Sequence, residues 1–338
     1  MDFDEKATKE YNYSALGSLF NGVVCKYCGS LRWKEELHTF CCNGGKIELP
    51  QIKEPPPGFE EIFSNKHFMS NSRAYNSALS MASLGTDNKP EIAASFKVLG
   101  KMYHRIGSLT PNDNEKPKFA QMYFYDTENE TQNRLNQVKE LKPEVIERLQ
   151  TILHQVNPYV NSFKAALEID VPNCKIILHA DANCKPTDAH TRTYNLPSGS
   201  EVAVLMPGEG KGKLDVVIET KEGKLKYING VHRSYDALHY VVMLPYGQDG
   251  FQTGLKTANK KQTISVNQFY SYHLQVRHKS FNILLRCRRL SQQYIADQYA
   301  KVERSRMNWV YLNQKTIKVE KYQGLVDANS NGDLADAG

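Results

Sequence analysis

Apolar positions along the chain repeat with two different periods. After Pro143 they recur every three to four residues, the spacing of one buried helix face, at Val145, Leu149, Ile152 and Val156. Alternating or β-branched runs predict strands at residues 93–105, 119–125, 175–178, 201–205, 214–219 and 225–228, with a hairpin turn at 222–223. Residues 264–320 return to helical spacing, with one side formed by Leu290, Tyr294, Ile295, Tyr299 and Val302. We therefore expect an α+β fold with a mixed, mainly antiparallel sheet, helices and a basic helical C-terminal part.

A proline run and changes of composition divide the chain. Pro55, Pro56 and Pro57 lack N–H donors and hold φ near −65°, which is typical of an extended linker. We expect a zinc-binding unit at residues 1–50, a linker at 51–65, an α+β domain at 66–250, a basic helical segment at 251–326 and a disordered tail at 327–338. No apolar run approaches the ~20 residues of a membrane span, and the acidic start lacks a signal peptide. These features predict a soluble intracellular protein.

Four of the seven cysteines lie between positions 25 and 42, which in an intracellular chain indicates metal binding rather than disulfides. Cys25 and Cys28 form a C-x2-C pair, and His38 precedes the adjacent Cys41 and Cys42. Zinc takes four such ligands in a tetrahedron, so either His38 with Cys41 or both Cys41 and Cys42 complete the site. Four protein ligands leave no open position, which predicts a structural zinc that supplies folding energy. Free buried thiols are the alternative.

The charge of the chain is unevenly distributed. Residues 252–322 contain fourteen lysines and arginines against three acidic residues, which predicts an anionic partner. Arginine binds phosphate through a forked donor, and aromatic faces stack on bases. The candidate nucleic-acid-binding residues are Arg277, Arg286, Arg288, Arg289, Arg304, Arg306, Tyr270, Tyr272 and Trp309. They suit single strands or flexed duplex DNA; alternatively, the aromatic residues pack in the core and the arginines only face water.

Catalytic motifs are absent from the sequence. A phosphate-binding loop requires G-x4-G-K followed by Ser or Thr, and no Gly-Lys pair fits, so residues 207–213 are interpreted as a surface turn. Neither His-x-His, H-E-x-x-H nor G-x-S-x-G occurs. We therefore predict that this chain is not an enzyme.

Short sequence blocks follow one another in an ordered series. They include Cys25-Lys-Tyr-Cys28, Arg73-Ala-Tyr-Asn-Ser77, Tyr103-His-Arg-Ile-Gly-Ser-Leu109, Leu244-Pro-Tyr-Gly247 and Gln293-Tyr-Ile-Ala-Asp297. The series, from Cys25 to about Asp327, resembles the N-terminal region of Helitron-type rolling-circle transposases, often labelled helicase-like although it contains no helicase motor.

In such transposases a nuclease domain with His-x-His and an ATP-dependent helicase follow this region. The resemblance includes the Cys41-Cys42 pair but not His38, and so implies the zinc ligands Cys25, Cys28, Cys41 and Cys42. The ending after Gln323 departs from the family, which suggests a truncated or degenerate reading frame.

The residues and the resemblance together predict a non-catalytic DNA-binding module. It would position transposon DNA for nuclease and helicase domains in the same or a partner polypeptide, and its affinity should fall steeply with salt. The alternatives are a truncated piece of a nuclease–helicase whose activity lies downstream, and a protein-interaction remnant. The DNA substrate implies nuclear localisation, with the cytoplasm otherwise.

Overall fold

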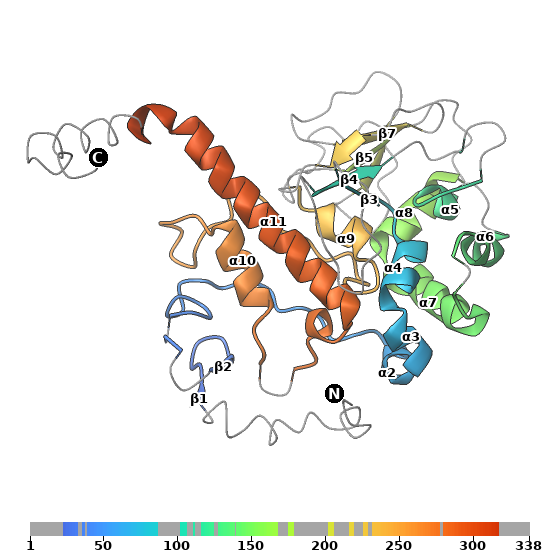
Figure 1. The fold of residues 1–338 in the computed structure, drawn as a ribbon, viewed down its shortest axis with the longest axis horizontal. Coiled ribbons are helices and arrows are strands. Elements are labelled where there is room, and N and C mark those ends of the chain that lie inside the picture. Colours follow the sequence, from blue (N-terminus) through green and yellow to red (C-terminus); the bar gives the residue numbers. More distant parts are fainter. Residues whose placement is uncertain are drawn as a thin grey trace, which may run out of the picture.

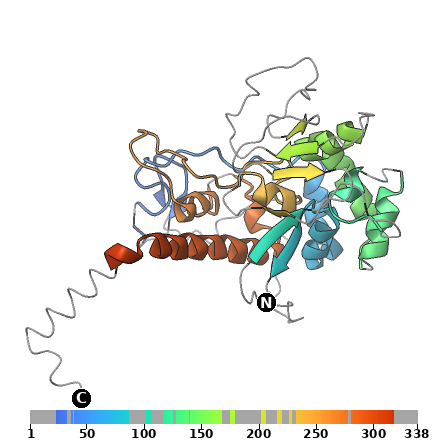
Figure 2. The same cartoon turned by 90° about the horizontal axis from the view of Figure 1, so that it is seen from above.

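One long helix, α11 (Arg289–Leu312), crosses the body of the protein (Figure 1). The computed structural model describes residues 23–32, 36–37, 39–86, 102–106, 111, 116–124, 128–138, 140–167, 175–178, 202–205, 216–219, 226–228, 232–277 and 280–317. Both views show α11 from the side, with α10 (Val266–His273) beside its middle, where Tyr270 contacts Tyr294 and Lys301, and with most other helices towards the end where α11 begins (Figures 1 and 2).

The described strands form small antiparallel sheets. Strand β1 (Val23–Val24) pairs with β2 (Leu31–Arg32), β4 (Met102–Ile106) lies between β3 (Ser83–Thr86) and β8 (Lys226–Ile228), and β5 (Lys175–Leu178) lies between β6 (Val202–Leu205) and β7 (Val216–Glu219). The antiparallel pairing agrees with the sequence pattern. The expected mixed sheet is wrong for the described part of the chain, where the strands form separate sheets with antiparallel pairs alone. The predicted hairpin is also wrong, because β8 pairs with β4 instead of β7.

Three short helices follow the proline run: α2 (Phe59–Ser64), α3 (Lys66–Ser70) and α4 (Ser72–Leu79). Gly58 has a φ of 88°, a conformation that glycine adopts without strain, and it leads directly into α2. The Asn65 side chain accepts hydrogen bonds from the backbone amides of His67 and Phe68 and thereby caps α3. Phe59 and Ile62 are buried, so the later part of the segment expected to be a linker belongs to the core.

The strand expected at residues 119–125 is instead a short helix, α5 (Gln121–Phe124). Met122, Tyr123 and Phe124 are consecutive and all buried. When both sides of a segment are buried, an apolar run does not distinguish strand from helix, which explains the wrong prediction. The Tyr123 hydroxyl donates to the Leu79 carbonyl oxygen over 2.6 Å and fixes α5 against the end of α4.

The helix predicted from the period of apolar residues is confirmed. It is α7 (Pro143–Val156), with proline in its first turn and with Val145, Leu149 and Ile152 buried. It packs between α6 (Glu130–Gln137) and α8 (Pro158–Leu167). Among the described residues, none of the helices is long and apolar enough to span a bilayer.

Helix α11 presents a partly polar face to the core. Leu290, Tyr294 and Val302 are buried as the sequence predicts, but Ile295 and Tyr299 are 42% and 64% exposed. The positions that turn inward instead are polar: Gln293, Asp297, Gln298 and Lys301. The predicted apolar face is therefore wrong for two of its five members.

Partners for this polar face come from α9 (Tyr235–His239) and α10. Lys301 Nζ lies 2.5 Å from Asp236 Oδ1, and the Tyr270 hydroxyl donates to Asp236 Oδ2 over 2.8 Å. The hydroxyls of Tyr235 and Tyr240 donate to the two oxygens of Asp297 over 3.0 and 3.1 Å. Burying polar groups costs little when they are paired in this way, so the network fixes α11 against α9 and α10.

Candidate metal centre and basic surface

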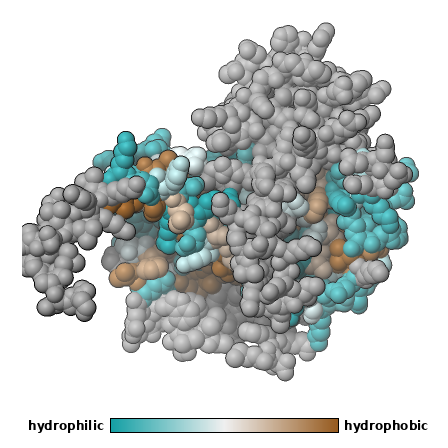
Figure 3. All heavy atoms as spheres, turned by 45° about the horizontal axis from the view of Figure 1, so that its top comes forward, coloured by the Kyte–Doolittle hydropathy of each residue, from teal (hydrophilic) through white to brown (hydrophobic). Residues whose placement is uncertain are grey.

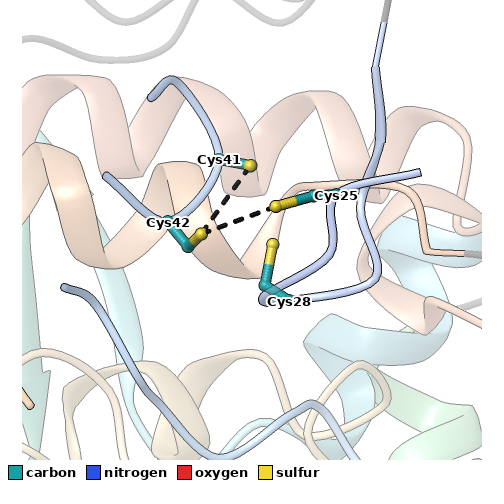
Figure 4. Close-up of side chains that lie close together, drawn as sticks. All are labelled: Cys25, Cys28, Cys41 and Cys42. Carbon is teal, nitrogen blue, oxygen red and sulfur yellow. Dashed lines mark hydrogen bonds between the residues drawn. The ribbon is translucent and has the colours of Figure 1, made fainter. Parts of the chain in front are cut away.

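Four buried cysteine side chains converge near the N-terminus (Figure 4). The Sγ atoms of Cys25, Cys28, Cys41 and Cys42 all lie within 4.8 Å of one another. Cys42 Sγ is 3.7 Å from Cys25 Sγ and 3.9 Å from Cys41 Sγ, and none of these cysteines forms a disulfide. One metal ion could therefore contact all four sulfur atoms.

Two loops bring the four sulfurs together. The first is a tight turn after β1, closed by a hydrogen bond of 2.9 Å from Gly29 N to the Cys25 carbonyl oxygen. The second passes through Asn43, Gly44 and Gly45, all with positive φ, so the backbone reverses directly after the adjacent cysteines. Gly45 N donates to Cys42 Sγ over 3.2 Å. These turns allow neighbouring residues 41 and 42 to point at the same centre.

Burial and local hydrogen bonds act differently on these thiols. Burial raises the pKa of Cys41 and raises the pKa of Cys42 to about 11. Burial also raises the pKa of Cys25, but hydrogen bonds from the backbone of Cys28 and Tyr27 and from the thiols of Cys41 and Cys28 together outweigh it and bring that pKa down to about 7. A cation among the four sulfurs would favour the thiolate form of every member of the set.

The described part of residues 23–50, which we call the cysteine unit, packs against the C-terminal part of the chain. Leu31 N donates to the Val276 carbonyl oxygen over 2.8 Å, and Ser30 Oγ donates to Gln275 Oε1 over 2.9 Å. Arg277 Nε donates to the Cys28 carbonyl oxygen over 3.1 Å. Residues some 250 positions apart thus form one structure, and the same buried core includes the cysteines and α10.

His38, the other ligand considered from the sequence, lies outside the described residues. The four cysteines alone provide a complete set of ligand atoms.

Three of the predicted nucleic-acid-binding residues are buried. Tyr270, Tyr272 and Arg277 are 3%, 4% and 6% exposed. Tyr270 donates to Asp236 in the polar network, and Arg277 Nη2 donates to the Tyr272 carbonyl oxygen over 2.8 Å while its guanidinium covers the Tyr272 ring. Their burial leaves no face for a base or phosphate, so we remove them from the candidate interface.

Three other arginines gather where α11 begins. Arg288 and Arg289 are exposed, and Arg286 is half-buried with its guanidinium 4.0 Å from the Phe281 ring centroid. The first turn of α11 contains no acidic residue, and no side chain caps it. Cations at this end oppose the helix dipole, which makes their position unfavourable for α11 itself.

Sequence reasoning missed a fourth member of this group, Arg73. Burial lowers the pKa of its guanidinium, and the nearby charge of Arg289 lowers it further. Ser72 Oγ donates to the Cys287 carbonyl oxygen over 2.8 Å, which holds α4 beside the start of α11. Only the fold joins residue 73 to residues 286–289. We call Arg73, Arg286, Arg288 and Arg289 the arginine cluster.

The remaining predicted residues lie further along α11. Arg306 is seventeen residues after Arg289, about 25 Å at 1.5 Å per residue. Its guanidinium is 3.7 Å from Glu303 Oε1, an exposed pair that contributes little stability. Arg304 is half-buried, and Trp309 is 59% exposed. Apolar residues also reach the surface in this part of the molecule, between hydrophilic ones (Figure 3).

The fold and the site define a helical protein with small antiparallel sheets, a four-cysteine centre and a basic helical end. Residues 269–337 match the family described as the Helitron helicase-like domain at the N-terminus. This match, roughly a fifth of the chain, includes α11 and most of α10 and confirms the similarity to the N-terminal region of Helitron transposases. No curated protein matches the chain.

Proposed function

We propose that this chain is a non-catalytic DNA-binding module of a Helitron-type transposase, stabilised by a structural zinc ion. The observation that carries the proposal is the arginine cluster, in which exposed cations meet at one end of α11 without acidic residues in the first turn. The segment that contains α11 is the part that matches the Helitron helicase-like domain. DNA is the substrate of such transposases.

Zinc is the metal that the donor set favours. Buried thiolates are soft ligands, and zinc binds four of them in tetrahedral structural sites with Zn–S bonds of about 2.3 Å. A tetrahedron of that size has edges of about 3.8 Å. The two sulfur–sulfur distances of 3.7 and 3.9 Å are compatible with this geometry. With four protein ligands there is no position for substrate, so the ion would stabilise the fold.

The arginine cluster fits a phosphate backbone better than it fits a protein core. Two of its members are exposed, and like charges lie close enough for Arg289 to lower the pKa of Arg73. Keeping like charges together costs free energy, and the phosphate charges of a bound polyanion would offset that cost. The release of counterions condensed on the polyanion would add to the affinity. The proposal includes DNA delivery to nuclease and helicase domains in cis or in trans, and it implies a nuclear location.

The test is fluorescence anisotropy of the zinc-loaded chain with labelled single- and double-stranded 20-mers across a salt series. The variant is Arg288→Glu/Arg289→Glu, and the matched control is Lys116→Glu/Lys118→Glu, which makes the same charge change at two exposed positions near α5. Losing two phosphate contacts should lower the slope of log affinity against log salt by about 1.4 for single strands and about 1.8 for duplex. Affinity at low salt should fall at least roughly tenfold for the variant.

The control variant should retain the wild-type slope. No binding by the folded, zinc-loaded wild type at low salt would refute the DNA-binding function. Equal losses in both variants would show that net charge alone, and not the arginine cluster, determines binding.

A further inference from the structure

We propose that the four-cysteine unit is itself a platform for unpaired bases, with Tyr27 and Phe40 as stacking rings and a neighbouring lysine hairpin as the phosphate contact. This inference rests on the proposed DNA-binding function and specifies its substrate as single-stranded nucleic acid. The lysine hairpin is residues 256–263, which contain Lys256, Lys260 and Lys261.

Both rings are unusually exposed for large aromatic side chains. Tyr27 is 59% exposed and Phe40 is 62% exposed. Tyr27 directly precedes Cys28 and Phe40 directly precedes Cys41, so the two rings are carried by the two loops whose sulfurs converge within 4.8 Å. A bound metal would hold these loops, and with them the rings, in a fixed relation.

One face of the Tyr27 ring lies on the backbone of the second loop. A methyl group at Gly45 would fall 2.7 Å from Tyr27 Cδ1, and Gly45 has a φ of +83°. The glycine therefore allows a contact that no other residue would. Lys26, which is exposed, has its Nζ over the same ring, 5.0 Å from the centroid. A ring supported on one face by backbone and accompanied by an exposed cation is a suitable surface for a stacked base.

The lysine hairpin lies against the cysteine unit through a backbone hydrogen bond. Ala258 N donates to the Lys46 carbonyl oxygen over 2.9 Å. The hairpin is closed by Thr257, whose amide donates to the Gln262 carbonyl oxygen over 2.9 Å. Its three lysines and Lys46 are exposed, and none forms an ion pair with a carboxylate within the described part of the chain.

The charge balance selects the occupant. Within the described residues of 23–50 and 251–264, six lysines and arginines stand against two glutamates. An exposed apolar patch that bound another protein would not need this excess of cations. Aromatic rings beside a basic groove are the combination that binds single strands with little sequence preference, because every base has a face to stack. In a duplex these faces are already stacked, so the rings favour single strands.

The experiment uses the full zinc-loaded chain, labelled dT20 and a 20-base-pair duplex. Tyr27→Ala/Phe40→Ala should bind dT20 at least roughly thirtyfold more weakly and the duplex within about twofold of wild type, because the lost contacts are to base faces. The salt slope should not change, since no cation is removed. Lys260→Glu/Lys261→Glu should instead lower the slope on dT20 by about 1.4.

The matched control is Tyr299→Ala/Tyr311→Ala, which removes two exposed rings from α11. It should bind dT20 within about threefold of wild type. Zinc content and the thermal midpoint of each variant confirm that it is folded. Unchanged dT20 affinity of Tyr27→Ala/Phe40→Ala, or an equal loss on duplex, would overturn the inference while leaving the proposed function in place if Arg288→Glu/Arg289→Glu still weakens binding. A wild type that binds neither DNA would refute both.

Discussion

The identity of the metal ligands can be decided by comparing two single substitutions. Tetrahedral edges of 3.7 and 3.9 Å correspond to metal–sulfur distances of about 2.3 and 2.4 Å. We therefore expect one zinc per chain with four sulfur neighbours. Cys41→Ser removes one of them, and because apparent zinc affinities of small sites reach about 10–16 kcal/mol and supply folding energy, the cysteine unit should lose its fold. His38→Ala should leave zinc in place.

Zinc content by elemental analysis and X-ray absorption at the zinc edge measure these outcomes. Wild type and His38→Ala should both give a single shell of four sulfurs near 2.3 Å, and Cys41→Ser should retain less than one zinc after dialysis against a weak chelator. A nitrogen shell near 2.0–2.1 Å that disappears in His38→Ala would refute the four-cysteine assignment. A wild type that contains no metal would refute the metal centre as a whole.

Three further measurements test the packing around the site. Lys301→Met leaves the Asp236 carboxylate buried without its cation and should lower the free energy of unfolding in urea by about 3–5 kcal/mol, whereas Lys315→Met at an exposed position should change it by less than about 0.5 kcal/mol. Burial lowers the pKa of His273 from 6.5 to about 4, and the Arg277 charge has a smaller effect in the same direction. Between these two pH values the imidazole is therefore protonated in the unfolded chain but not in the folded one. Stability should therefore fall by up to about 3 kcal/mol as pH drops from 6.5 to 4, and His273→Phe should flatten that dependence; an unchanged slope would contradict the assignment. Arg277→Lys cannot donate in the same fork to two carbonyl oxygens and should cost about 1–3 kcal/mol in the same assay, while a loss within error would show that the docking is weaker than its geometry suggests.

The sequence predicts elements well where one face of a helix is apolar and the other polar. Helix α7 satisfies this condition: Val145, Leu149 and Ile152 are buried as the spacing indicates, although Val156 is only partly buried. Helix α11 does not, because Asp297 and Lys301 turn inward to partners on α9 and α10 while Tyr299 faces outward. No periodicity of apolar residues reports such partners, since they come from other parts of the chain.

The candidate site, too, could be predicted from the sequence only in part. The spacing C-x2-C and the adjacent pair Cys41-Cys42 indicate a metal site from the sequence, because zinc sites use short ligand spacings, but they leave His38 open as a ligand. The four-cysteine set is what the resemblance implies, and the structure brings these four sulfurs together. The membership of the arginine cluster could not be predicted, since Arg73 joins it only through the contact between α4 and the start of α11. Likewise, the burial of Arg277 depends on a carbonyl oxygen almost 250 residues away.

The contacts between the cysteine unit and the C-terminal part of the chain make the packing of each depend on the other. Arg277 lies in the segment that matches the Helitron helicase-like domain and donates to the carbonyl oxygen of Cys28, a proposed metal ligand. Leu31 and Val276 add a backbone hydrogen bond to the same contact. A bound metal would therefore order the loop that completes the packing of Arg277, and the packing of Arg277 in turn supports the loop that carries Cys28. The docked cysteines do not form an independent finger on a linker, since Arg277 and Val276 of the matched segment contact them directly. Loss of a bound metal would free the Cys28 carbonyl oxygen from Arg277, and metal occupancy would thus be coupled to the packing of that segment.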